Sequence, residues 1–177
     1  MHFVCFLDIL TIRTENFTEA VKTKKAVSKK ILHHASDILN SKNMLSEKNY
    51  IQHGNISCFE HSLNVAEKSI FICKFFSIKT NERALIRGAL LHDYFLYDWH
   101  SAAQKLHGFF HAETALKNAK KDFSLCQIEE DIIKKHMFPL NITPPKHRES
   151  WIVCIADKIC AVEETFLGLL LFFTNLV

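Results

Sequence analysis

The chain has 177 residues, of which 48% are apolar and 23% are charged, and its formal net charge is +3. A chain of this length and balance is expected to form one globular domain, which excludes a disordered protein and a fibre. The mild positive charge excludes the dense basic surface that binds a DNA or RNA duplex.

Glycine and proline usage narrows the fold class. The chain contains four glycines and three prolines. No glycines have the spacing of a phosphate-binding loop, of a dinucleotide-binding fingerprint or of the nucleophile elbow of α/β hydrolases. Turn signals are too few for a protein of many strands. The sequence therefore predicts an all-α fold.

Helical periodicity runs through most of the chain. A stripe of apolar residues at intervals of three and four marks the second helix, and Thr80 or Asn81 is a suitable cap for the third. Ser124 can cap the fifth helix. The expected helices lie at about 17–40, 57–76, 80–92, 111–121, 124–137 and 147–173. The main connections between them are a polar one at 41–55, an aromatic one at 94–110 and a loop with all three prolines at 138–146.

These helices are expected to pack as an irregular bundle of about five to seven helices. The sequence shows no internal repeat, low-complexity tract or linker, so residues 1–177 should form a single domain. Within it, we expect an N-terminal helical arm at about 1–50 and a core at about 51–165 that carries the functional residues.

Cysteine usage and the apolar C-terminal run bear on location and partners. The six cysteines form no CxxC pair and mostly lie in apolar helical stretches, which indicates buried thiols in a reduced cytoplasm. The run 166–173 is too short to span a bilayer, so no membrane span is expected. Because this run is apolar on all sides, it can form a contact in a homo-oligomer.

Several polar residues lie on helix faces that should be apolar. His61 shares a face with Val65, and His92 and Asp93 follow an apolar helix. A buried carboxylate is costly unless it is paired or bound to a cation. Imidazole together with carboxylate suits Fe, Mn, Co, Ni or Zn, and Mg less well. The sequence therefore predicts a divalent metal site. The inward polar residues are His61, His92, Asp93, His136 and Asp157.

The order of these residues carries a family resemblance. His61 is followed by His92-Asp93 within Gly-Ala-Leu-Leu-His-Asp, and then by Asp157 within Cys-Ile-Ala-Asp-Lys. This pattern resembles the HD superfamily of metal-dependent phosphohydrolases over about residues 52–161. The resemblance implies that His61, His92, Asp93 and Asp157 bind a first metal ion.

Two further histidines resemble ligands of the binuclear branch of that family. His111 in His-Ala-Glu-Thr-Ala and His136 in Lys-Lys-His-Met would bind a second ion, with Asp93 as the bridge between the two ions. The nearer match is to the compact bacterial members. His107, four residues before His111, is the competing candidate ligand. The sequence therefore allows either one or two bound divalent ions.

One position departs from the family pattern. A lysine usually lies three residues after the His-Asp pair, but here that residue is Leu96. We expect another cation to face the substrate and assist catalysis together with Asp93. The candidates are Lys158, next to Asp157, and Arg87 in the turn before His92.

The resemblance implies hydrolysis of a phosphate ester or anhydride by a metal-activated water, and the small phosphorylated substrate is expected to be a nucleotide. Two other functions are consistent with the same residues. A silent regulatory or binding module would keep the fold without turnover, and a di-iron oxygenase would use the same ligands. Metal identity separates the oxygenase from a hydrolase that uses Mn or Co.

Overall fold

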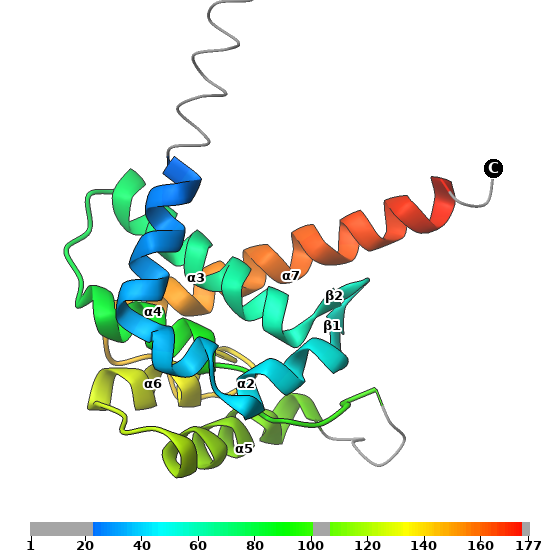
Figure 1. Ribbon diagram of the computed structural model, residues 1–177. Helices are drawn as coiled ribbons and strands as arrows, with labels where there is room; N and C mark the ends of the chain where they lie inside the picture. The colour runs from blue at the N-terminus through cyan, green and yellow to red at the C-terminus, as the bar shows by residue number, and fades with distance from the viewer. Residues whose placement is uncertain (1–22, 101–106, 175–177) are drawn as a thin grey trace, which may run out of the picture.

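The computed structural model describes residues 23–100 and 107–174. The start of the first predicted helix, in the N-terminal arm, therefore lies outside the described residues. Within them the protein is an irregular helical bundle with one small hairpin (Figure 1), so the predicted all-α bundle of five to seven helices is confirmed.

The helices begin and end close to the predicted positions. Residues 23–39 form a helix. The elements that follow are α2 (Lys42–Ser46), the 3-10 helix η1 (Glu47–Asn49), β1 (Ile51–His53), β2 (Ile56–Ser57), α3 (Cys58–Phe75), α4 (Glu82–Leu91), α5 (His107–Asp122), α6 (Gln127–Lys135) and α7 (Arg148–Thr174). The core is formed by apolar residues from α3, α4, α5, α6, α7 and the helix at 23–39.

Capping residues explain where several helices begin. Ser57 and Glu60 form a capping box at α3, and Asn81 caps α4 through its side chain, as predicted. The cap of α6 is Cys126, so the prediction of Ser124 is wrong. Glu129 accounts for the shift, because its carboxylate accepts a hydrogen bond from the Cys126 backbone amide at 2.8 Å.

The polar connection predicted at 41–55 contains more structure than expected. It includes α2, η1 and the strand β1, which pairs antiparallel with β2. Gly54 at the turn has a φ of +56°, a conformation that glycine adopts without strain. A Cβ atom built on Gly168 would lie 2.8 Å from the Gly54 Cα atom. The hairpin is therefore seated directly against α7.

A second close approach joins α4 to α6. A Cβ atom at Gly88 would lie 2.4 Å from Cδ1 and 3.0 Å from Cβ of Ile132. Glycine at this position lets the two helix backbones come together. Both helices end at the site described below, so their spacing also sets the positions of residues there.

Replacing Gly88 by alanine is expected to destabilise the protein by about 1–2 kcal/mol, because overpacking against Ile132 outweighs the gain in helix propensity. Urea unfolding measures the change. Gly108→Ala is the matched control, since its Cβ would lie 3.5 Å from Leu140 Cδ2, an ordinary contact. Adding Ile132→Val to Gly88→Ala should recover part of the loss. A rise in the urea midpoint for Gly88→Ala alone would contradict the tight approach.

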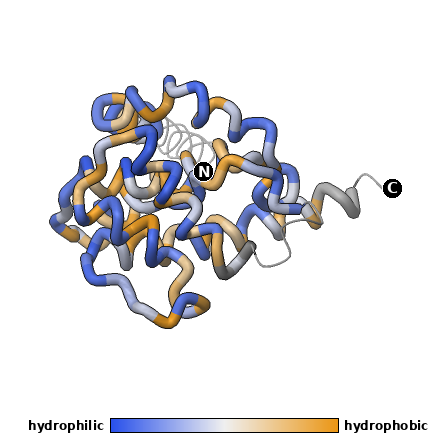
Figure 2. The backbone as a smooth tube through the Cα atoms, turned by 90° about the horizontal axis from the view of Figure 1, so that it is seen from below, coloured by the Kyte–Doolittle hydropathy of each residue, from blue (hydrophilic) through white to orange (hydrophobic). Residues whose placement is uncertain are grey.

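The second half of α7 extends beyond the other helices (Figure 1). Several of its described side chains are apolar and exposed, among them Phe166 at 67% and Leu169 at 53%. Elsewhere, short apolar stretches alternate with polar ones along the chain, as expected for helices that bury one face (Figure 2). Among the described helices, none combines the length and apolarity needed to cross a bilayer.

Candidate metal centre

Two of the predicted ligands lie where helices end. His92 is the C-cap of α4 and His136 is the C-cap of α6. The Nδ1 atom of His92 donates to the Ala89 carbonyl at 2.7 Å, and that of His136 donates to the Ile133 carbonyl at 2.8 Å. A carbonyl only accepts, so each ring carries its proton on Nδ1. The Nε2 atoms are thereby turned to the centre of the bundle.

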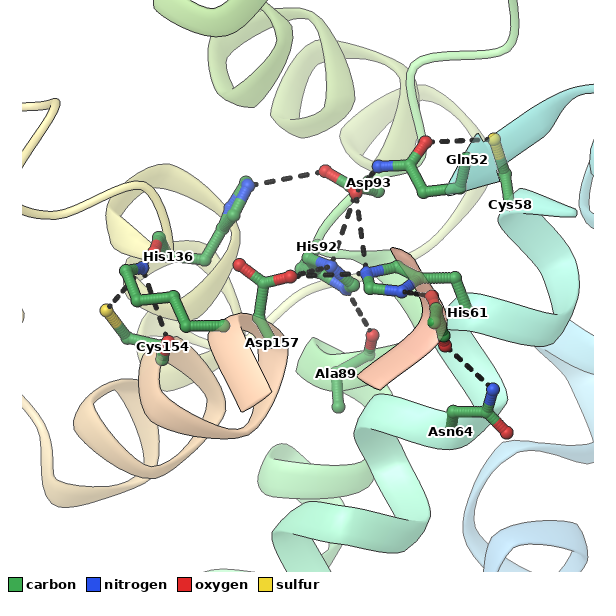
Figure 3. Close-up of polar contacts among 12 residues, drawn as sticks. Gln52, Cys58, His61, Asn64, Ala89, His92, Asp93, His136, Cys154 and Asp157 are labelled. Atoms are coloured by element: carbon green, nitrogen blue, oxygen red, sulfur yellow. Dashed lines mark hydrogen bonds and ion pairs between the residues drawn. The ribbon is translucent and has the colours of Figure 1, made fainter. Parts of the chain in front are cut away.

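The first group of ligands comes from three helices. His61 on α3 and Asp157 on α7 lie 3.2 Å apart between Nε2 and Oδ1. His92 Nε2 lies 3.6 Å from the same Oδ1 atom. All three side chains are buried, and their ligand atoms lie within 4.8 Å of one another (Figure 3). We call this group the first ion position.

The second group gathers at the other side of Asp93. His111 in α5 and His136 present Nε2 atoms that are 2.9 Å apart. These atoms lie 3.2 Å and 3.3 Å from Asp93 Oδ1. We call Asp93, His111 and His136 the second ion position. His111 was expected to open its helix, but α5 begins at His107.

Asp93 faces both groups with different oxygen atoms. Its Oδ1 atom faces His111 and His136, whereas Oδ2 lies 3.4 Å from His92 Nε2 and 3.9 Å from His61 Nε2. The carboxylate therefore lies between the two ion positions, as a bridging ligand must.

The residues present fit divalent cations. His92 Nε2 and Asp93 Oδ1 are buried and have no hydrogen-bond partner among the described residues. Buried lone pairs without a partner are costly, and a cation beside them would remove that cost. Nitrogen from imidazole and oxygen from carboxylate are the donors that first-row transition metals prefer. Among the described residues, only the two ion positions bring three donor atoms from His, Cys, Asp or Glu this close together.

Neighbouring charges shift the pKa values of the ligands. Burial alone would lower the pKa of His61, but its hydrogen bonds to Asp157 and Glu164 raise it to about 9. Burial would raise the pKa of Asp93, yet the neighbouring imidazoles of His92, His111 and His136 hold it well below its usual value. Asp157 is likewise ionised, because the hydrogen bond from His61 and the nearby His92 ring outweigh its burial and lower its pKa. Both carboxylates are available as anionic ligands.

Two partners of the ligands were missed in the sequence. Gln52 on β1 donates Nε2 to Asp93 Oδ2 at 2.6 Å and accepts from the Cys58 thiol at 3.2 Å (Figure 3). Glu164 accepts a hydrogen bond from His61 Nδ1 at 2.8 Å. A signal existed for Glu164, which follows Asp157 by seven residues and so lies on the same helix face. Strand alternation over three residues was too short to identify Gln52.

The two predicted cations have different surroundings. Lys158 lies beside the centre, where Nζ donates to the His136 carbonyl at 2.9 Å and to the Cys154 carbonyl at 3.3 Å. Arg87 is turned to other helices, and it donates to Glu129 Oε1 at 3.1 Å and to Asp37 Oδ2 at 2.8 Å. These two carboxylates take up the buried guanidinium of Arg87, so Lys158 is the better placed of the two candidate cations.

Leu96, at the position of the family lysine, lies in an unusual backbone conformation. Its φ is +63°, which costs a residue with a Cβ atom about 1–2 kcal/mol. Asn118 holds the preceding backbone by donating to the carbonyls of Tyr94 and Phe95 at 3.2 and 3.0 Å. The segment after Asp93 is thus bent sharply and fixed against α5. The side chain of His107, the competing ligand, lies outside the described residues.

Comparison with protein families agrees with this geometry. Residues 58–162 match the HD domain. The chain belongs to the HD domain family. This match spans more than half of the chain and contains every residue placed at the two ion positions, and it confirms the resemblance found in the sequence. Neither a curated protein nor a solved structure matches the chain. HD domains form a metal-dependent hydrolase-type family, so the His/Asp groups of this HD domain are candidates to hold divalent metal ions.

Proposed function

We propose that this HD domain protein is a metal-dependent phosphohydrolase that cleaves a phosphate ester or anhydride, with a nucleotide as the substrate. One observation carries the proposal. The two oxygens of Asp93 face two separate groups of histidines, one with Asp157 and one without. Two neighbouring ion positions with a shared carboxylate are the arrangement that hydrolytic two-metal sites use.

Divalent ions bound there would lower the pKa of a water molecule and offset charge on the phosphoryl oxygens. The chain's own residues set the geometry. Asp93 fixes the spacing of the two positions, and Gln52 orients its carboxylate through the 2.6 Å hydrogen bond. Because the ring protons of His92 and His136 are held on Nδ1 by backbone carbonyls, their Nε2 lone pairs stay directed inward.

The cysteines in this network do not act as covalent nucleophiles. Burial raises the pKa of the Cys58 thiol, which is the donor to Gln52. Burial also raises the pKa of Cys154, despite the nearby charge of Lys158. A protonated thiol is a poor nucleophile. Attack by water on phosphorus fits these residues better than a covalent intermediate.

Aromatic side chains next to the centre support a nucleotide as the substrate. Phe95 is buried, with its ring centroid 6.0 Å from that of His111 and 4.9 Å from that of Tyr97. It therefore supports Tyr97 from within, and Tyr97 is the ring of this pair that a base can reach. Tyr97 is half-buried, and burial raises its pKa. The negative charge of nearby Asp93 raises it further. Aromatic faces stack on nucleobases with little dependence on which base is present. A nucleoside phosphate would place its base on this segment.

Metal analysis followed by a phosphate-release screen tests the proposed function. Purified protein should contain divalent metal, and reconstituted protein should release phosphate from at least one member of a nucleotide panel. Full metal content without turnover on any phosphorylated compound would instead support a regulatory or binding module. A mixed-valent di-iron signal in electron paramagnetic resonance, with oxidation in place of phosphate release, would support an oxygenase.

Lys158→Ala separates two roles of this lysine. If its ammonium faces the phosphoryl group during turnover, kcat should fall roughly tenfold to a thousandfold with metal content unchanged. If it only fixes the end of α6 through the His136 carbonyl, the metal-to-protein ratio should fall as well. We expect the first result. Lys146→Ala, a lysine in the loop before α7, is the control and should alter neither quantity. Unchanged kcat and metal content in Lys158→Ala would contradict both roles.

Two further features support proposals on assembly and location. The exposed apolar side chains of α7, among them Val162 and Phe166, support a homo-oligomer formed through this helix. The protein's mass in solution tests that proposal. The described cysteines are all free thiols, which supports a location in the reducing cytoplasm. They are Cys58, Cys73, Cys126, Cys154 and Cys160.

A further inference from the structure

We propose that Glu164 makes the first ion position the tighter of the two, because its carboxylate orients and polarises His61. The proposal rests on the proposed metal centre and extends it, since Glu164 binds no ion itself. It acts as a positioning residue through His61. The consequence is that the two positions fill in a fixed order as metal is added.

The partner at Nδ1 distinguishes His61 from two other ligands. His92 and His136 each donate to a neutral backbone carbonyl in their own helix. His61 donates instead to a carboxylate, at 2.8 Å, from another helix. An anionic acceptor draws the Nδ1 proton toward itself and leaves more electron density on Nε2. Nε2 of His61 is therefore expected to be the more basic donor to a cation.

Glu164 is itself held in place. Its Oε2 atom accepts from His61, and its Oε1 atom accepts from Asn64 Nδ2 at 2.8 Å. The side chain is only 7% exposed. A Cβ atom at Gly54 would lie 3.0 Å from the Glu164 carbonyl oxygen, so the hairpin turn packs directly on this turn of α7. With both oxygens engaged, the carboxylate keeps one orientation toward His61.

The neighbouring glutamate provides a contrast within the same helix. Glu163 has a side chain that is 58% exposed and pairs with Lys68 on the surface. It makes no contact with a residue of either ion position among the interactions described. Glu163 and Glu164 share residue type and helix turn, so they form a matched pair for substitution.

The test uses a background with one ion position. His111→Ala removes a ligand of the second position, so metal-free protein with this change should bind one ion. In that background Glu164→Gln keeps the side-chain size but loses the negative charge. Calorimetric titration with Co²⁺ is expected to show an affinity about 10–100-fold weaker, the usual effect of losing such a partner. Glu163→Gln in the same background should leave the affinity unchanged.

Two further measurements guard against a purely structural effect. The visible absorption of bound Co²⁺ should shift in Glu164→Gln, because the donor strength of His61 changes while the ligand set does not. Asn64→Ala, which loosens Glu164 but leaves its charge, should give a smaller loss of affinity. This second variant keeps the proposal testable if Glu164→Gln does not fold. When Glu164→Gln is made alone, without His111→Ala, the tighter of the two Co²⁺ binding events should weaken. The affinity of the other event should not change.

Each outcome has a distinct meaning. Equal Co²⁺ affinity in Glu164→Gln and Glu163→Gln would overturn the role of Glu164 and leave the metal centre intact. Equal weakening of both binding events in the otherwise unchanged protein would overturn the order of filling. A protein that binds no Co²⁺, Mn²⁺ or Fe²⁺ at all would instead overturn the proposed function, and with it this inference.

Discussion

Asp93→Ala is expected to remove bound metal and phosphate release together, because a single carboxylate serves both ion positions. The substitution should lower the metal-to-protein ratio toward zero and reduce phosphate release to the uncatalysed level. It should also destabilise the protein by about 3–5 kcal/mol, the usual cost of breaking a buried ion pair. Without the Asp93 carboxylate, the ion pairs with His92, His111 and His136 would be lost. Plasma emission spectrometry measures the metal content, a phosphate-release assay measures turnover, and thermal unfolding measures the loss of stability.

Two controls accompany this experiment. Asp93→Asn keeps the size of the side chain, so it separates the loss of charge from the loss of packing. Asp98→Ala removes an exposed carboxylate five residues later and should keep both metal and activity. Full metal content in Asp93→Ala would show that the two positions do not share this ligand, and the bridging role would then be wrong.

The second large effect concerns His111 and His136. Replacing either residue by alanine should lower the metal-to-protein ratio from about two to about one, because each supplies one of three ligand groups at the second position. Phosphate release should fall with the loss of the second ion, while the first ion stays bound. His100→Ala, which removes an exposed histidine, is the control.

The same series decides between the two candidate histidines of α5. If His107→Ala lowers the ratio and His111→Ala does not, His107 is the ligand and the assignment of His111 is refuted. Unaltered protein that saturates at one ion, even with excess Mn²⁺ or Fe²⁺, would reject the second position altogether. The metal-to-protein ratio of unaltered protein should therefore be measured first.

Helical periodicity predicted most of the bundle because each helix buries one apolar face. The hairpin was missed for a physical reason. Strands of three and two residues are too short to show alternation, and this hairpin forms because its turn packs on α7 at Gly168. The contact joins residues far apart in the sequence, so no local pattern reports it. The cap of α6 depended on a single carboxylate, that of Glu129.

The ligands of the candidate site were easier to predict than the residues that surround them. His61, Asp93 and Asp157 stood out because a polar group on an apolar face needs a partner. Arg87 was chosen for its place one turn before His92, and its partners Asp37 and Glu129 come from helices whose placement the sequence does not give. An inward polar residue indicates a buried partner, and only its position in the fold shows whether that partner is a side chain or a cation.

The charges of the ligands have a consequence for the order in which substrate and metal bind. Two divalent cations would bring about four positive charges, whereas Asp93 and Asp157 bring two negative ones and neutral imidazoles none. The carboxyl ends of α4 and α6 contribute about half a negative charge each. Glu164 behind His61 adds one negative charge, and Lys158 beside the centre offsets it with one positive charge. A positive surplus therefore remains, which attracts a phosphate anion even with Leu96 in place of a lysine. Phosphate affinity should then depend on metal occupancy, and by linkage phosphate must tighten metal binding by the same factor.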